Sequence, residues 1–105
     1  MIVLEDLGNQ QGWEKITPSA SIGITASLIR PTTGKNAGLT AKAALIGVET
    51  NPIRIRMDGT APTATNGLLL KADSYLTIIN AENISNLLMI DDGATTAAVM
   101  VLLFF

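Results

Sequence analysis

The stretch IRIRMDGTAPTATNG, residues 53–67, begins with strict alternation of isoleucine and arginine and ends in small, turn-forming residues. Alternation with a period of two is typical of a β-strand that has one dry face and one wet face. We therefore expect Ile53 and Ile55 to point into a core, and Arg54 and Arg56 to point toward solvent. The stretch predicts a half-buried strand followed by an extended loop.

A strong turn signal, Asp58-Gly59, ends this strand, and the loop after it closes at Asn66-Gly67. Outward from here, short apolar runs recur along the chain between glycine, proline and asparagine residues, which is the pattern of successive strands. No long segment keeps a helical apolar period, and residues 81–87 have room for one helical turn or a bend. The strand-like segments are 13–17, 21–29, 41–50, 53–57, 68–80 with a turn near Ala72-Asp73, 87–91 and 97–105.

About seven short strands punctuated by turns predict an all-β fold, either a small antiparallel β-sandwich or a jelly-roll-like barrel. The length of 105 residues favours one domain. We divide the chain into an N-terminal arm, residues 1–12, and a single β-sandwich domain, residues 13–105. The apolar run at 97–105 is expected to be a buried terminal strand, since it is too short to cross a bilayer as a helix. We expect no contact with a membrane.

The composition favours contact with other proteins. Hydrophobic residues make up 48% of the chain, aromatic residues 4% and charged residues 15%. With so few charges, the fold is expected to leave apolar surface exposed, and large exposed apolar patches usually mark a partner. The net charge is −2 and no basic cluster is visible, so nucleic acid is not an expected partner.

The residue types needed for common enzyme chemistry are scarce. The chain contains no histidine and no cysteine, which removes the commonest general base, the best nucleophile and thiolate zinc sites. The densest carboxylate pair is Asp91-Asp92, but adjacent residues of a strand point to opposite faces, so a turn is the simpler interpretation. Gly34-Lys35 lacks the rest of a phosphate-binding loop. We expect no enzymatic activity, no cofactor and no metal.

Two roles are open for the paired arginines. Arg54 and Arg56 would project from one strand face about 6.5–7 Å apart, where two guanidinium groups can hold carboxylates or phosphates through paired hydrogen bonds. The simpler interpretation is solvated charge, paired across strands with Glu49 or Asp73. A place at a subunit interface is the remaining alternative.

Residues 44–78 follow a pattern that extends beyond the arginines. An apolar strand ends in Glu49, the strand with alternating arginines follows, and then come Asp58-Gly59, the segment PTATNG at 62–67 and three leucines at 68–70. This pattern resembles that of small phage virion structural proteins, a class of head decoration (cement) proteins and other minor particle components. The later NISNLLMID segment and the apolar C-terminal strand also fit its layout.

The resemblance implies a small β-sandwich without catalytic residues that stabilises a phage head by binding the shell surface. Its partners would be the major capsid protein, or another virion protein, and further copies of itself, most simply as a homotrimer. It would be made in the host cytoplasm and reside on the capsid surface, with residues 1–12 and 30–40 reaching toward the shell. The candidate subunit or capsid contacts are Arg54, Arg56, Asp58, Thr60, Pro62, Thr63 and Trp13.

Three other functions remain open. A minor neck or tail component of the virion would share the fold and the composition. A carbohydrate-binding or adhesion module would need several exposed aromatic side chains on one face, and the chain has one Trp, one Tyr and two Phe. A small enzyme would have to rely on carboxylates such as Asp91 and Asp92.

Overall fold

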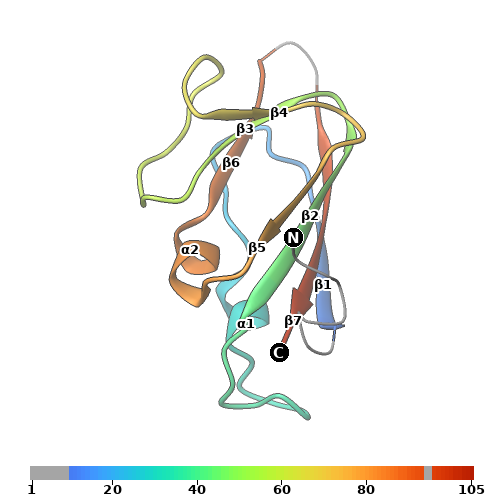
Figure 1. The fold of residues 1–105 in the computed structure, drawn as a ribbon, viewed down its shortest axis with the longest axis vertical. Coiled ribbons are helices and arrows are strands. Elements are labelled where there is room, and N and C mark those ends of the chain that lie inside the picture. The colour runs from blue at the N-terminus through green and yellow to red at the C-terminus, as the bar shows by residue number, and fades with distance from the viewer. Residues whose placement is uncertain (1–9, 94–95) are drawn as a thin grey trace.

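The computed structural model describes residues 10–93 and 96–105, which form two antiparallel β-sheets packed face to face (Figure 1). Two short helices, α1 (Ala26–Ile29) and α2 (Ala81–Asn86), lie next to each other beside the sheets. The four-stranded sheet has the order β1 (Gln10–Ile16), β7 (Ala98–Phe104), β2 (Ala43–Thr50) and β5 (Tyr75–Ile78). The three-stranded sheet has the order β4 (Leu68–Leu70), β3 (Ile53–Arg56) and β6 (Leu88–Asp91).

The prediction of a small antiparallel β-sandwich is confirmed. The jelly-roll-like barrel is not, because every strand ladder within the described ranges joins strands of the same sheet. Each sheet therefore keeps two edges, and the molecule has two distinct outer surfaces.

The core lies between the sheets and is almost wholly aliphatic. Ala44, Ile46 and Val48 of β2 point inward. They belong to the same buried cluster as Ile53 and Ile55 of β3. In β3 the period of two in the sequence is therefore also the burial pattern, whereas in β2 Ala43 and Gly47 on the other face are buried as well. The inward direction of both β3 isoleucines is confirmed.

The apolar C-terminal segment forms a central strand. β7 pairs with β1 on one side and with β2 on the other, and its Val99, Val101 and Leu103 are fully buried. The prediction of a buried terminal strand is confirmed. Two neighbouring strands depend on β7 for their hydrogen-bond ladders.

The first strand begins at Gln10, three residues before its expected start at Trp13. Gln10 and Gly12 pair with Phe104 and Leu103 across an irregular register. Their polar or absent side chains do not prevent this, because the ladder is made by the backbone and β1 is an edge strand. Residues 10–12 thus belong to the sandwich, and residues 1–9 of the expected arm lie outside the described residues.

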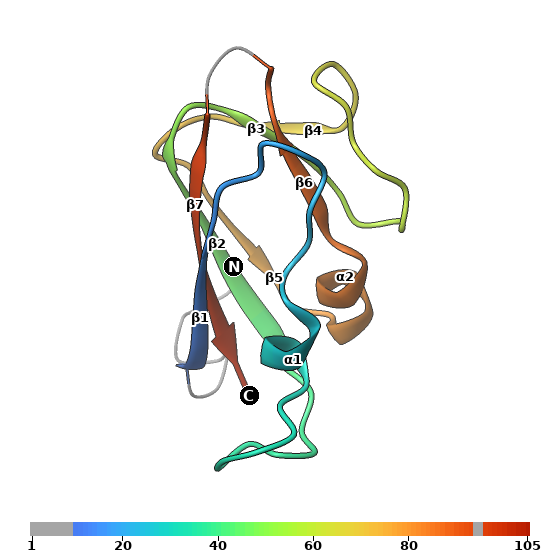
Figure 2. The same ribbon diagram turned by 180° about the vertical axis from the view of Figure 1, so that it is seen from behind.

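The alternating segment 21–29 does not form the strand that was predicted. Only Ile22 makes a β-bridge, with Met89 of β6, and the chain then turns into α1 (Figure 2). The carboxylate of Glu14 explains the turn, because it accepts hydrogen bonds from both the backbone N–H (2.9 Å) and the hydroxyl (2.5 Å) of Thr25. Those bonds hold the residue before α1 against β1 instead of letting the segment extend along β6.

Of the two alternatives expected at 81–87, a helical turn or a bend, the chain forms the helix α2. The Asn80 side-chain oxygen accepts hydrogen bonds from the backbone N–H groups of Glu82 (2.8 Å) and Asn83 (3.2 Å), which is how asparagine stabilises a helix start. Ile84 on its inner side is fully buried. The helix thereby closes one part of the core.

Candidate interaction surfaces

Six of the seven predicted contact residues lie on one surface, which we call the loop surface: Arg54, Arg56 and the loop 57–67. It covers the exposed side of β3 and extends beyond the three-stranded sheet (Figure 1). Local hydrogen bonds within this stretch determine its shape, so each predicted residue has a specific structural setting.

The side chain of Arg54 is half-buried and makes contacts within the fold. In the ladder it lies between Leu69 of β4 and Ile90 of β6. Its Nη1 donates a 3.0 Å hydrogen bond to the backbone oxygen of Gly67. Its Nε is buried and has no hydrogen-bond partner in the part of the chain that the structure describes. The arginine thus lies on the outward side of β3, as expected, but it is half-buried there and ties the end of the loop to the strand.

Arg56 forms an ion pair with Asp58 instead of with a neighbouring strand. Its Nε donates to Asp58 Oδ1 over 3.1 Å and its Nη2 to Oδ2 over 2.5 Å. The same Oδ1 accepts the backbone N–H of Thr60 at 3.1 Å, which fixes the predicted Asp58-Gly59 turn. Because Arg56 is already neutralised, this surface presents one compensated pair and not two free guanidinium groups.

The contacts of Asp58 change the pKa of its carboxyl group. The hydrogen bond from Arg56, then that from the Thr60 N–H, lower the pKa of the Asp58 carboxyl below its ordinary value. Any stability that the pair contributes is present above the ordinary pKa and is lost as pH falls through the lowered one. We expect Arg56→Gln to raise the pKa of Asp58 while Arg30→Gln leaves it unchanged, as followed by NMR titration of the side-chain carboxyl carbon. An unchanged value in Arg56→Gln would contradict the pairing.

The tip of the loop is shaped by its own backbone. Thr63 and Asn66 exchange backbone hydrogen bonds of 2.9 and 3.2 Å, and the Thr63 hydroxyl accepts the N–H of Thr65 at 3.3 Å. Thr60 and Thr63 are exposed, whereas Pro62 is buried. The two threonines are therefore available for contact with a partner, and Pro62 supports the loop from below.

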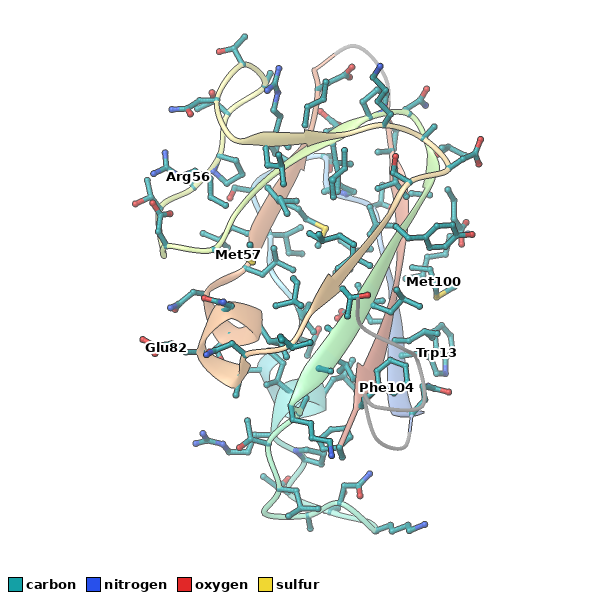
Figure 3. All side chains as sticks on the ribbon, viewed as in Figure 1. Trp13, Arg56, Met57, Glu82, Met100 and Phe104 are labelled. Atoms are coloured by element: carbon teal, nitrogen blue, oxygen red, sulfur yellow. The ribbon has the colours of Figure 1, made fainter. Side chains whose placement is uncertain are left out.

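Trp13, the seventh predicted contact residue, does not join the others. Figure 3 shows it beside Met100 on one side of the molecule, with Arg56 on the opposite side. Trp13 belongs to β1 in the four-stranded sheet and is 62% exposed. The sequence-based set thus divides between two surfaces.

The surface around Trp13, which we call the outer face, is the exposed side of the four-stranded sheet. Directly paired residues share one face of an antiparallel sheet, so the ladder gives two rows across it. Aliphatic side chains fill its middle and an exposed aromatic side chain stands in each edge strand. The outer face comprises Trp13, Leu102, Leu45 and Thr77 in one row, Lys15, Met100, Gly47 and Tyr75 in the next, and Glu49 beyond them.

A hollow lies in the outer face beside Tyr75, which is 75% exposed. Gly47 opens it, because a side chain there would come within 3.3 Å of the Tyr75 ring. Among the described residues, a small apolar part of about 70 Å³ is lined by Leu45, Gly47, Tyr75, Met100 and Leu102. A larger part of about 310 Å³ shares three of these residues and reaches Glu49 and Asp73. The outer-face hollow is therefore apolar with an acidic rim.

Among the described residues of this face, Lys15 Nζ forms an ion pair with Glu49 Oε2 over 3.5 Å. The β3 arginines were expected to pair with Glu49 or Asp73, and the pairing with Glu49 is wrong, because Arg56 pairs with Asp58 and Glu49 pairs with Lys15 of β1. Both side chains of the pair are about half exposed, so it contributes little to stability. Because the pair lies beside the hollow, its charges are placed to contact a partner that binds there.

The loop 30–40 and a hollow next to α1 are two further candidate contact sites. The loop 30–40 projects from one end of the molecule (Figure 1), and hydrogen bonds such as Gly38 N–H to Pro31 oxygen (3.0 Å) give it a defined form. A separate hollow of about 460 Å³ is lined by Ile24, Ala26, Ser27, Ile29, Arg30 and Ser85. Of these wall residues Arg30 is the charged one, and its Nε donates to the Thr40 hydroxyl at 3.1 Å.

The carboxylate of Asp91 at the end of β6 takes part in a turn. Asp91 Oδ1 accepts the backbone N–H of Gly93 at 3.0 Å, which is a turn contact. Across residues 10–93 and 96–105, no three acidic residues gather in a way that could hold a metal ion. No helix among these residues is long and apolar enough to span a membrane.

Comparison of the chain with protein-family models, with curated proteins and with solved structures finds no match. Function must therefore be argued from the two surfaces themselves. The sequence-based set missed Tyr75, Met100 and Leu102. The available signal was the absence of polar residues from either face of 43–48 and 98–104, which indicates apolar surface on both sides of those strands.

Proposed function

We propose that the chain is a non-enzymatic structural protein of a phage particle, which associates with copies of itself and binds the protein shell as a decoration protein. The observation that carries the proposal is the outer face, an apolar sheet surface on which Trp13 and Tyr75 are 62% and 75% exposed. Such a surface on a small domain indicates that the domain works within an assembly. The resemblance of residues 44–78 to virion proteins supplies the kind of assembly.

The two surfaces suit two different contacts. The outer face is mainly apolar, as lasting interfaces between like subunits tend to be. The loop surface is polar and its shape is held by local hydrogen bonds such as Arg54 to Gly67, so little conformational entropy is lost when it binds. We assign the outer face to self-association and the loop surface to the shell. Copies that hold both the shell and each other would attach more firmly than either weak contact allows alone, because the contacts are linked.

Electron microscopy of particles assembled with and without the gene tests this function. We expect extra density on the outside of the shell only when the protein is present, and particles that withstand heating less well without it. Substituting Thr60 and Thr63 together by lysine should reduce binding of the purified protein to bare shells. Density at the neck or tail would reassign the protein to a minor component, and no particle-associated density would refute the proposal.

A carbohydrate-binding module is the second candidate, because the two exposed aromatic side chains share a face. They stand in the two edge strands of the sheet, however, and Leu102 and Leu45 between them offer no hydrogen bonds to sugar hydroxyls. A glycan array with the purified protein separates the candidates. Saturable sugar binding without affinity for shells would reverse their order.

A further inference from the structure

We propose that the outer face binds a second copy of this chain, face to face about a two-fold axis that runs along β7, with Trp13 of each copy seated in the outer-face hollow of the other. The inference rests on the proposed self-association and names its surface and partner. It replaces the homotrimer implied by the resemblance with a pair, since a two-fold contact uses the same patch on both copies.

The positions of Trp13 and the hollow carry the two-fold arrangement. Trp13 projects from β1, and the hollow is centred on Leu45 and Gly47 of β2. β7 lies between these strands, so the projecting ring and the hollow are each about 5 Å from the line of β7. A two-fold axis along β7 exchanges the two sides, which places each Trp13 against the hollow of the other copy.

The charges on the outer face support the same arrangement. Lys15 stands two residues from Trp13 on the same strand face, and the rim of the hollow carries Glu49 and Asp73. Within one copy Lys15 pairs with Glu49, and the rotation that brings Trp13 into the hollow also brings this lysine to the Glu49 and Asp73 rim of the other copy, twice per pair. Complementary charge of this kind specifies the partner and the orientation. A foreign partner would have to present both features by coincidence, whereas a second copy presents them together.

The size of the face indicates how firmly two copies would associate. β7 has seven residues, hence a length of about 24 Å, and four strands span about 15–20 Å. Each copy would bury roughly 400 Å², or about 800 Å² in total, which is less than a stable specific interface buries and fits a weak, transient one. We therefore expect a pair that forms and separates with concentration, and that becomes lasting only when both copies also hold a shell.

The single tryptophan makes the contact visible, since Trp13 is the only one in the chain. As protein concentration rises from low micromolar toward millimolar, we expect its fluorescence to shift to shorter wavelength in step with a monomer-to-dimer transition in sedimentation equilibrium. Tyr75→Ser should weaken dimerisation at least tenfold. Leu39→Ser, which removes a similarly exposed apolar side chain (52%) in the loop 30–40, should leave it unchanged.

A mixing experiment separates contact between copies from the ion pair within one copy. Lys15→Glu and Glu49→Lys should each prevent pairing alone, because like charges then meet across the axis. Mixed in equal amounts, the two variants should form a mixed dimer, although each still lacks its internal ion pair. Failure of the mixture to associate, when the unsubstituted chain does associate, would overturn the proposed geometry.

Other occupants of the face predict other results. If residues 1–9 of the same chain cover it, the emission will not depend on concentration and deleting those residues will shift it to longer wavelength, which overturns the proposal. A trimer in sedimentation overturns it also. Dimers that do not bind shells would refute the proposed function alone, and a Tyr75→Ser monomer that still binds shells would show that shell binding does not need the pair.

Discussion

Deleting Val101–Phe105 is expected to prevent the chain from folding. The deletion removes the second half of β7, where Val101 and Leu103 are fully buried and where both β1 and β2 find their ladder partners. Each large apolar side chain buried here contributes roughly 1.5–3 kcal/mol, against a total stability of about 5–15 kcal/mol for a typical domain. Far-ultraviolet circular dichroism should show loss of the β signal, and urea should produce no cooperative transition.

Two single substitutions in the same strand serve as controls. Leu103→Ala creates a cavity in the core and should cost about 2–5 kcal/mol while leaving a folded protein. Leu102→Ala alters the half-buried opposite side of β7 and should cost less than Leu103→Ala. A truncated protein that unfolds cooperatively at the original urea concentration would show that β7 is not the central strand of the core.

The fold was largely predictable wherever the spacing of apolar residues in the sequence matched only one kind of secondary structure. Ile53 and Ile55 were placed correctly because their arginine neighbours leave only one dry face. The prediction for segment 21–29 was wrong for a physical reason: the hydrogen bonds from Thr25 to the Glu14 carboxylate turn the chain into α1 at Ala26. Such tertiary contacts are not encoded in the local pattern of apolar residues.

The candidate site was less predictable because it depends on register. Trp13 and the β3 arginines both looked like contact residues, but only strand pairing reveals that they belong to different sheets. The partner of Arg54 is the oxygen of Gly67, a backbone group thirteen residues away that no side-chain pattern marks. The outer face requires Leu45, Met100 and Tyr75 to be adjacent, and three strands far apart in sequence bring them together.

Gly67 lies where the loop surface contacts the core, and its substitution is expected to lower the stability of the protein strongly. Its φ of 126° is one that residues with a side chain rarely adopt, and a Cβ there would lie 2.9 Å from the Ile55 oxygen and 3.2 Å from Pro62 Cβ. Gly67→Ala should therefore destabilise the protein by about 2–5 kcal/mol through backbone strain and crowding together. The substitution should also disturb the hydrogen bond that Gly67 accepts from Arg54.

Gly59→Ala is the matched control for Gly67→Ala, because it makes the same change in the same loop at a positive φ of 81°. Nothing lies within 4 Å of a Cβ added at Gly59, so only the left-handed backbone is penalised, by about 1–2 kcal/mol. The difference between the two variants in urea unfolding thus reports the close approach of the loop to Ile55 and Pro62, together with the more restricted φ at Gly67. Equal losses would mean that the loop does not pack onto β3, and a loop surface without that support would lose the entropic advantage on which its assignment to shell binding depends.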